Sequence, residues 1–284
     1  MRVRFVATLF LWIITTAALA VAVPTSWAQK NVVDENGYSA LATSAAKEPQ
    51  LQQAMANELG TQLKKLVEGT GYDVSTDLLR SAAGTYTASP VFPGQFAQAN
   101  RIAHRWMFTD SVQQADASGR WQIDLSPMLS DSSFRQTLQQ FGIEAPSTLE
   151  VPLTENLSDS VRPGQLRQLS TWGPWVSVGT TILTVVFALL TLAAARSRGK
   201  ALAALGVSAL MVGGAGWAGL EVARRYINTA LDRTTGDIRR VADAMVNHAE
   251  DSLHQWLNLT LAAGGVLVVF GVVVAMLGGL RQRD

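Results

Sequence analysis

The chain has 284 residues, of which 48% are hydrophobic and 16% charged, and its formal net charge is +1. This composition is too apolar for a soluble domain and too mixed for a bundle of membrane helices alone, so it predicts a membrane protein with one sizeable aqueous domain. The chain lacks cysteine, which excludes disulfides, thiol catalysis and thiolate metal sites. No basic patch is interleaved with aromatic residues, so nucleic-acid binding is not expected.

The first apolar run, residues 5–23, fits either a cleaved signal peptide or a retained membrane helix. Small residues before Gln29 suit a signal peptidase, and Arg2 and Arg4 suit the basic region that precedes such a segment. The run is about 19 residues long, however, whereas the apolar part of a signal peptide has roughly 7 to 15. Retention is therefore favoured, and removal of residues 1–28 as a signal peptide is the alternative.

Residues 24–173 form a segment of about 150 residues, which is long enough to bury a core of its own. Two helices separated at Pro49 are predicted first, because apolar residues recur at helical spacing between Leu51 and Leu66. A shorter helix follows, with Ser75 or Thr76 as its cap. The sequence "FPGQFAQANRIAHRWMF" predicts a further amphipathic helix.

The second half of this segment mixes strand and helix patterns. Apolar and polar residues alternate in "WQIDL" and in "STLEVPLTE", so these two stretches are expected to pair as a small sheet. Between them, "SDSSFRQTLQQFGI" is typical of a helix, and "RPGQLRQL" predicts a helix that leads into the next apolar segment. The expected fold is a mainly α (α+β) domain on a membrane α-helical protein.

Three later segments are apolar over about 20 residues each, the length that crosses a bilayer as a helix. They are residues 174–195, 201–220 and 257–280. Like the first run, none of them contains Asp, Glu, Lys, Arg or His. Basic residues collect in the short segments at one set of ends, and cytoplasmic segments carry the excess of Lys and Arg. We therefore predict four transmembrane helices in the plasma membrane, with cytoplasmic segments at residues 1–4, 196–200 and 281–284.

Residues 221–256 join the last two apolar segments on the predicted extracytoplasmic side. Apolar residues from Ile238 to Trp256 recur at helical spacing, and Asp237 can cap a helix after a turn. The adjoining membrane helices are expected to continue outward as a helical hairpin whose apolar stripe packs on the large domain. The alternative is a hairpin that lies on anionic lipid through its arginines.

Two sets of residues in the spans have predicted structural roles. Small residues at helical spacing favour close helix packing, within the chain or to a partner protein. The candidates for this packing are Gly206, Gly213, Gly214, Gly264, Gly271 and Gly278. Tryptophans at the outer ends of the spans are typical of an interfacial aromatic belt. These membrane-interface anchors are Trp27, Trp172, Trp175, Trp217 and Trp256.

No pattern of catalytic, metal-binding or cofactor-binding residues is found, so no metal and no cofactor are expected. His248 and His254 are six residues apart and therefore face different sides of a helix, which argues against a shared metal. His104 is the one histidine of the large domain, where a general base beside Asp110 is conceivable; a lone histidine of this kind is more often a hydrogen-bonded structural residue. The uncharged spans also argue against an ion-coupled transporter.

The order of features resembles a family of uncharacterised integral membrane proteins of high-GC Gram-positive bacteria. The resemblance rests on "NVVDENGYSALATSAAKEPQLQQAMANEL", "SPVFPGQFAQANRIAHRWM", "WQIDLSPML" and "FGIEAP", followed by three apolar segments. It implies one N-terminal membrane helix, an extracytoplasmic helical domain and three C-terminal membrane helices, with no assigned reaction. The loop before the last helix departs from the simplest members in length and charge.

These observations lead to one functional expectation and an alternative. The chain is expected to be a non-catalytic envelope protein of the plasma membrane that acts through contact with a membrane-protein partner or lipid. The alternative is an accessory subunit of an exporter or envelope-lipid transport system, which would hold a lipid chain in an apolar groove between the domain and the hairpin.

Overall fold

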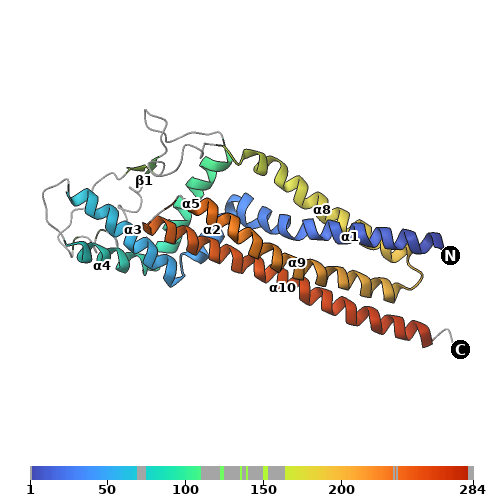
Figure 1. Cartoon of the computed structure of the whole chain (residues 1–284). Coiled ribbons are helices and arrows are strands. Elements are labelled where there is room, and N and C mark those ends of the chain that lie inside the picture. The colour runs from blue at the N-terminus through green and yellow to red at the C-terminus, as the bar shows by residue number, and fades with distance from the viewer. Residues whose placement is uncertain are drawn as a thin grey trace. The chain divides into compact units, whose positions relative to one another are not determined.

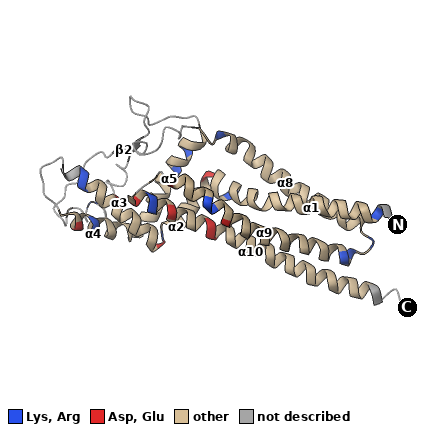
Figure 2. Ribbon diagram, in the orientation of Figure 1, with Lys and Arg blue, Asp and Glu red and all other residues tan. Residues whose placement is uncertain are grey.

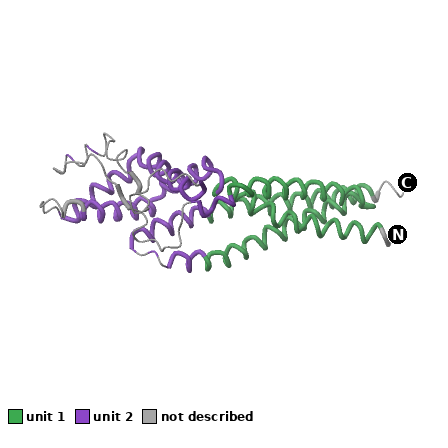
Figure 3. Tube along the Cα trace, turned by 90° about the horizontal axis from the view of Figure 1, so that it is seen from above, with its two compact units in different colours: residues 1–32, 170–226, 250–284 green, residues 33–169, 227–249 purple. Residues whose placement is uncertain are grey.

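The computed structural model describes residues 2–68, 75–109, 122–124, 135, 139, 150–152, 164–232, 234 and 236–280. The described chain is mainly α-helical, with one long apolar helix at its N-terminal end and three in its C-terminal part (Figure 1). It divides into two compact units (Figure 3). The membrane unit comprises residues 1–32, 170–226 and 250–284, and the domain unit comprises residues 33–169 and 227–249.

Four helices carry the apolar segments. They are α1 (Arg2–Ala28), α8 (Arg167–Ala194), α9 (Arg198–Leu231) and α10 (Gly236–Leu280). Each is long and apolar enough to cross a membrane, and charged residues avoid their apolar lengths (Figure 2). The protein is therefore a multi-pass membrane protein. Both α9 and α10 extend well beyond the apolar segments, as predicted for the hairpin.

Within the membrane unit, α1 contacts α8 and α9 through polar groups. The hydroxyl oxygens of Thr16 and Ser208 lie 2.7 Å apart, and the indole nitrogen of Trp12 donates to the carbonyl oxygen of Ala204 at 2.9 Å. The hydroxyls of Ser26 and Ser177 lie 3.3 Å apart near the other end of α1. Hydrogen bonds of this kind hold helices together in lipid, where the hydrophobic effect does not.

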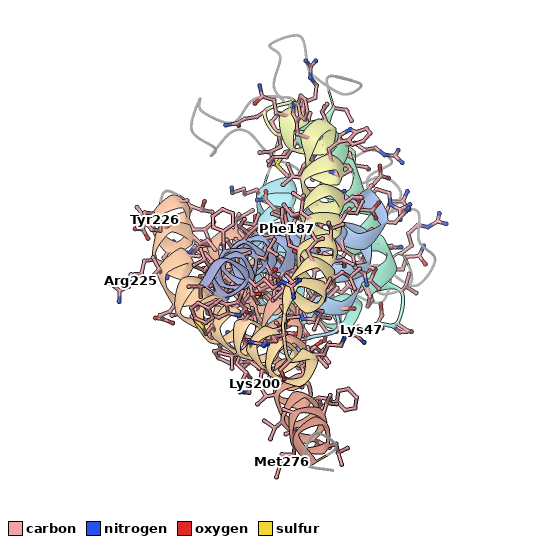
Figure 4. All side chains as sticks on the ribbon, turned by 90° about the vertical axis from the view of Figure 1, so that its right-hand side faces the viewer. Lys47, Phe187, Lys200, Arg225, Tyr226 and Met276 are labelled. Carbon is pink, nitrogen blue, oxygen red and sulfur yellow. The ribbon has the colours of Figure 1, made fainter. Side chains whose placement is uncertain are left out.

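Large side chains of the membrane helices point away from the neighbouring helices. Tyr226 on α9 and Met276 on α10 are directed away from the neighbouring helices (Figure 4), and they are 74% and 66% exposed. Only Ser177 and Thr191 are buried among the residues of α8. The surface of these helices is therefore apolar, as a lipid-facing surface requires.

The domain unit is built from short helices with defined starts. They are α2 (Glu35–Ala45), α3 (Pro49–Glu68), α4 (Thr76–Thr87) and α5 (Phe92–Phe108). A five-residue π-helix, Gln29–Val33, joins α1 to the cap of α2. The Asp34 carboxylate accepts from the amide of Gly37 at 2.7 Å, and Ser75 caps α4 by accepting from Leu78. Each cap satisfies an amide that the first helical turn leaves without a partner.

The core of the domain unit includes the outer part of α10, which is the part that belongs to this unit, residues 236–249. Leu51, Phe92 and Phe96 are buried there together with Ala244, and Val241 and Met245 of α10 pack against the cluster. Of the stripe predicted from Ile238 to Trp256, Val241 and Met245 are thus covered by the large domain, whereas Ile238 is exposed. The described residues within 227–249 and 33–169 therefore share one compact unit.

Two short strands and the segment before α8 complete the described fold. Strands β1 (Gln122–Asp124) and β2 (Glu150–Pro152) pair antiparallel with Ile123 opposite Val151, in the two stretches where alternation predicts strands. The helix predicted from "RPGQLRQL" begins only at Arg167. Residues 164–166 form a turn, in which Gly164 has a φ of 69° and its amide donates to the carbonyl of Trp106. Of the helix predicted at "SDSSFRQTLQQFGI", only residues 135 and 139 are described, and both are helical.

Candidate functional site

An ion pair connects α2 and α5 in the domain unit. The Arg105 guanidinium donates to both carboxylate oxygens of Glu35, at 2.7 and 2.9 Å, and Nε of Arg101 lies 3.6 Å from the same carboxylate. The hydrogen bond from Arg105 holds the pKa of Glu35 below its usual value, although partial burial opposes the shift. This paired carboxylate is therefore an acceptor that joins two helices.

His104 lies beside this ion pair in an aromatic cluster. Its ring stacks on Phe108 at a centroid distance of 4.2 Å and lies 5.2 Å from the ring of Tyr38. It is 4% exposed. The Tyr38 hydroxyl donates to Asn100 at 3.1 Å, and burial raises the pKa of Tyr38. Packing accounts for His104 here; Asp110, considered as its partner in general-base catalysis, lies outside the described residues.

The other two histidines have separate partners in separate units. His248 pairs with Glu48 at the segment between α2 and α3, which joins α10 to the rest of the domain unit. His254 stacks on Trp217 in the membrane unit, with centroids 3.9 Å apart. Within the described residues no group of three or more His, Asp or Glu could hold a metal ion.

A polar groove of roughly 400 Å³ lies between α3 and the outer part of α10. One wall comes from α3 and carries the carboxamides of Gln50, Gln53 and Asn57. The other wall comes from α10 and carries Arg240, Asp243 and Asn247. Both walls use the same spacing, i, i+3 and i+7, which places three side chains along one helix face.

The floor of this groove is formed by small residues, and its charged side chains are paired. Ala54 and Ala244 line it and are both buried, so the two helices approach closely there. Arg240 donates to Asp237 at 2.9 Å, and Asp243 accepts from Arg239 at 2.9 and 3.0 Å. Each charged residue of the groove therefore has an opposite charge beside it. Apart from the two alanines, each lining side chain carries a polar end group on a carbon chain.

The glycines of α9 and α10 form a close contact between these two helices. A Cβ atom at Gly206 would lie 2.6 Å from the backbone nitrogen of Val268 and 2.7 Å from the carbonyl oxygen of Gly264. Gly264 and Gly271 face the α9 backbone in the same way, and Gly213 faces the side chain of Leu261. Gly214 and Gly278 have no described atom within 4 Å of this position.

Gly199 belongs to the same contact, although sequence reasoning did not select it. A Cβ atom there would meet the backbone of Ala275. Gly199, Gly206 and Gly213 are seven residues apart, as are Gly264 and Gly271. This seven-residue spacing within α9 was the signal that could have found Gly199.

The five tryptophans differ in their surroundings. Trp172 and Trp175 on α8 are 65% and 74% exposed. Trp27 donates to the Ser252 hydroxyl at 3.2 Å, and Trp217 donates to Asn258 at 3.3 Å. Lys30 lies over the ring of Trp256, 5.7 Å from its centroid. Three of the five thus bind polar groups of the membrane unit, as amphipathic rings near helix ends can.

Sequence reasoning missed the polar groove and the pair of His248 with Glu48. Comparison of the chain with protein families, with curated proteins and with solved structures finds no match. The resemblance to a membrane-protein family therefore stays a prediction. Among the described residues the polar groove is the candidate site, since it combines a cavity with convergent polar side chains.

Proposed function

We propose that this protein is a non-catalytic component of the cell envelope, anchored in the plasma membrane and acting by contact through the domain unit. The observation that carries the proposal is the shared core of the domain unit. Ala244, from the loop between the last two spans, is buried with Leu51 and Phe96, from the loop between the first two. Both loops must therefore lie on the same side of the membrane, which agrees with four crossings.

The distribution of basic residues supports an extracytoplasmic location for that body. Arg196, Arg198 and Lys200 lie at the short connection between α8 and α9, opposite the side of the two long loops in a four-span topology. Short connections rich in Lys and Arg stay in the cytoplasm. The domain unit then faces outward, where it meets the other components of the envelope.

The character of the domain unit supports contact rather than chemistry. Its buried histidine, His104, is stacked on the ring of Phe108, and its paired carboxylate, Glu35, is held by Arg105. Its groove presents hydrogen-bonding side chains from α3 and α10. These features favour recognition of a polar partner, and they give less support to the alternative of a lipid-holding accessory subunit.

The test is a tagged pull-down from native membranes in mild detergent, with bound proteins and lipids identified together by mass spectrometry. We expect a defined envelope component to be recovered with the wild-type protein and lost when Gln53 on the groove wall is changed to Trp. Recovery of the protein alone, or turnover of an envelope substrate by the purified protein, would contradict the proposal.

A further inference from the structure

We propose that the groove between α3 and α10 is a binding site for a neutral oligosaccharide segment of an envelope glycan. The proposal rests on the function proposed above, because it names the partner that the domain unit contacts. Three observations support it: the hydrogen-bonding groups on the two walls, the balance of positive and negative charge in the groove, and the small side chains of its floor.

The walls present groups that match sugar hydroxyls. A carboxamide offers two N–H donors and a carbonyl acceptor, and a hydroxyl likewise both donates and accepts. Gln50, Gln53 and Asn57 have no hydrogen-bond partner for their side chains among the described residues, so these groups are available to a ligand. Adjacent hydroxyls on one sugar ring can therefore be bound by one carboxamide, with the ligand lying along the helix face.

The charge of the groove favours an uncharged ligand. Arg240 is paired with Asp237, and Asp243 is paired with Arg239. An anionic ligand would have to compete with Asp237 for the guanidinium, and a cationic one with Arg239 for the carboxylate. A neutral ligand can instead accept from Arg240 and donate to Asp243 without breaking either pair, since both groups have further hydrogen-bonding capacity.

The floor distinguishes a sugar chain from a peptide. Its apolar contacts are Ala54 and Ala244, which offer no pocket for a large apolar side chain. Peptide recognition takes its specificity from such pockets, whereas sugar hydroxyls can be bound by the hydrogen-bonding side chains of the two walls. A volume of roughly 400 Å³ is within the range of small-ligand sites.

The experiment measures sugar binding to the full chain in lipid nanodiscs by calorimetry. The nanodiscs contain phosphatidylethanolamine and phosphatidylglycerol, and glucoside and maltoside detergents are removed because their sugar head groups would compete for the site. The probes are cellotetraose and tetra-N-acetylchitotetraose, and an extended alanine–serine peptide is the comparison. We expect saturable binding of at least one sugar and no binding of the peptide.

Three variants locate the binding site. The double change Gln53→Ala with Asn57→Ala removes two hydrogen-bonding groups and should raise the Kd about tenfold or more. Gln53→Trp fills the groove from an exposed position and should abolish binding. Gln98→Ala changes an exposed glutamine on α5, away from the groove, and should leave the Kd unchanged. Near-identical circular dichroism spectra and thermal unfolding check that each variant is folded.

Each result decides the proposal. Absence of sugar binding, binding that Gln53→Trp leaves intact, or binding of the peptide in place of sugar would overturn it. Because the purified protein is used, the result does not depend on orientation in the cell. Sugar binding by a protein whose domain unit labels as cytoplasmic would refute the proposed function and leave the groove assignment in place.

Discussion

The close approach of α9 and α10 depends on glycine, whose side chain is a hydrogen atom where alanine has a methyl group. At Gly206 the missing Cβ would overlap backbone atoms, which cannot move away as the end of a flexible side chain can. At Gly214, eight residues further along α9, the same atom would meet open space. Two glycines of one helix therefore have different roles, and only the neighbouring helix distinguishes them.

Gly206→Ala should destabilise the membrane unit, because the added methyl group forces α9 away from α10. Overpacking of this kind costs about 1–3 kcal/mol. Gly214→Ala is the matched control, and it should leave stability unchanged or slightly higher, since alanine favours helix more than glycine does. Thermal unfolding of the purified protein in one detergent compares the two variants. Equal melting temperatures for both would contradict the close approach.

Glu35 gives a pH-dependent prediction at the same scale. Its folded-state pKa lies below the ordinary value of 4.5, so its pairing with Arg105 stabilises the domain unit above that value. The stabilisation is lost as the pH falls through the folded-state pKa. Glu35→Gln should therefore lower the melting temperature at pH 7, and the difference from wild type should vanish under acidic conditions.

Asp77→Asn is the control for this experiment. The Asp77 side chain is 96% exposed and lies 3.9 Å from Arg80, so its loss should have little effect at any pH. Melting temperatures measured between pH 3 and pH 7 for both variants provide the comparison. A difference for Glu35→Gln that does not change with pH would exclude the pairing as its cause.

At the scale of whole elements, α10 is a single helix that serves two environments. Its outer part contributes Ala244 to the core of the domain unit, and its later part contributes Gly264 and Gly271 to the membrane unit. The hydrophobic pattern changes accordingly, from one apolar stripe among charged residues to an apolar surface all round. One continuous backbone thus carries both patterns.

Ala244→Arg should disrupt the domain unit, because it places a charge among Leu51, Phe96 and the other core side chains. Ala230→Arg is the control, since Ala230 is exposed near the end of α9. Limited proteolysis is the measurement, and we expect faster cleavage between residues 33 and 169 in Ala244→Arg only. Equal cleavage of both variants would contradict a shared core.

The sequence predicted elements better than it predicted contacts. Periodic apolar residues identify α3, α5 and the four long helices, because burial of one face imposes that pattern. Ser75 could be recognised as a cap because the first turn of α4 requires one. The turn at Gly164 was missed, because its hydrogen bonds go to the distant end of α5.

The candidate site was harder to predict for the same reason. Gln50, Gln53 and Asn57 resemble the solvent-exposed face of an amphipathic helix until α10 is placed beside them. The pair of His248 with Glu48 joins residues 200 positions apart, and nothing in the local sequence marks either one. Long-range pairing of polar side chains has no periodic pattern, so spacing alone cannot reveal it.

At the scale of the whole molecule, the absence of cysteine makes the proposed topology directly testable. Gln98→Cys places a thiol on an exposed position of the domain unit, and Ser197→Cys places one in the connection between α8 and α9. We expect a membrane-impermeant maleimide to label the first in intact cells and the second only after the membrane is opened. The reverse pattern would mean that the domain unit faces the cytoplasm.

The hydroxyl groups of α1 also have a consequence for the order of synthesis. This helix leaves the ribosome well before α8 and α9 exist, yet it carries polar side chains into the membrane. Thr15 and Thr16 donate to the carbonyl oxygens of Leu11 and Trp12, at 2.8 and 2.9 Å, so both hydroxyls are satisfied within α1 itself. The nascent helix can therefore be inserted into lipid on its own without an unsatisfied hydroxyl at these two positions. Its contacts with Thr191 and Ser208 form after α8 and α9 have been synthesised and inserted.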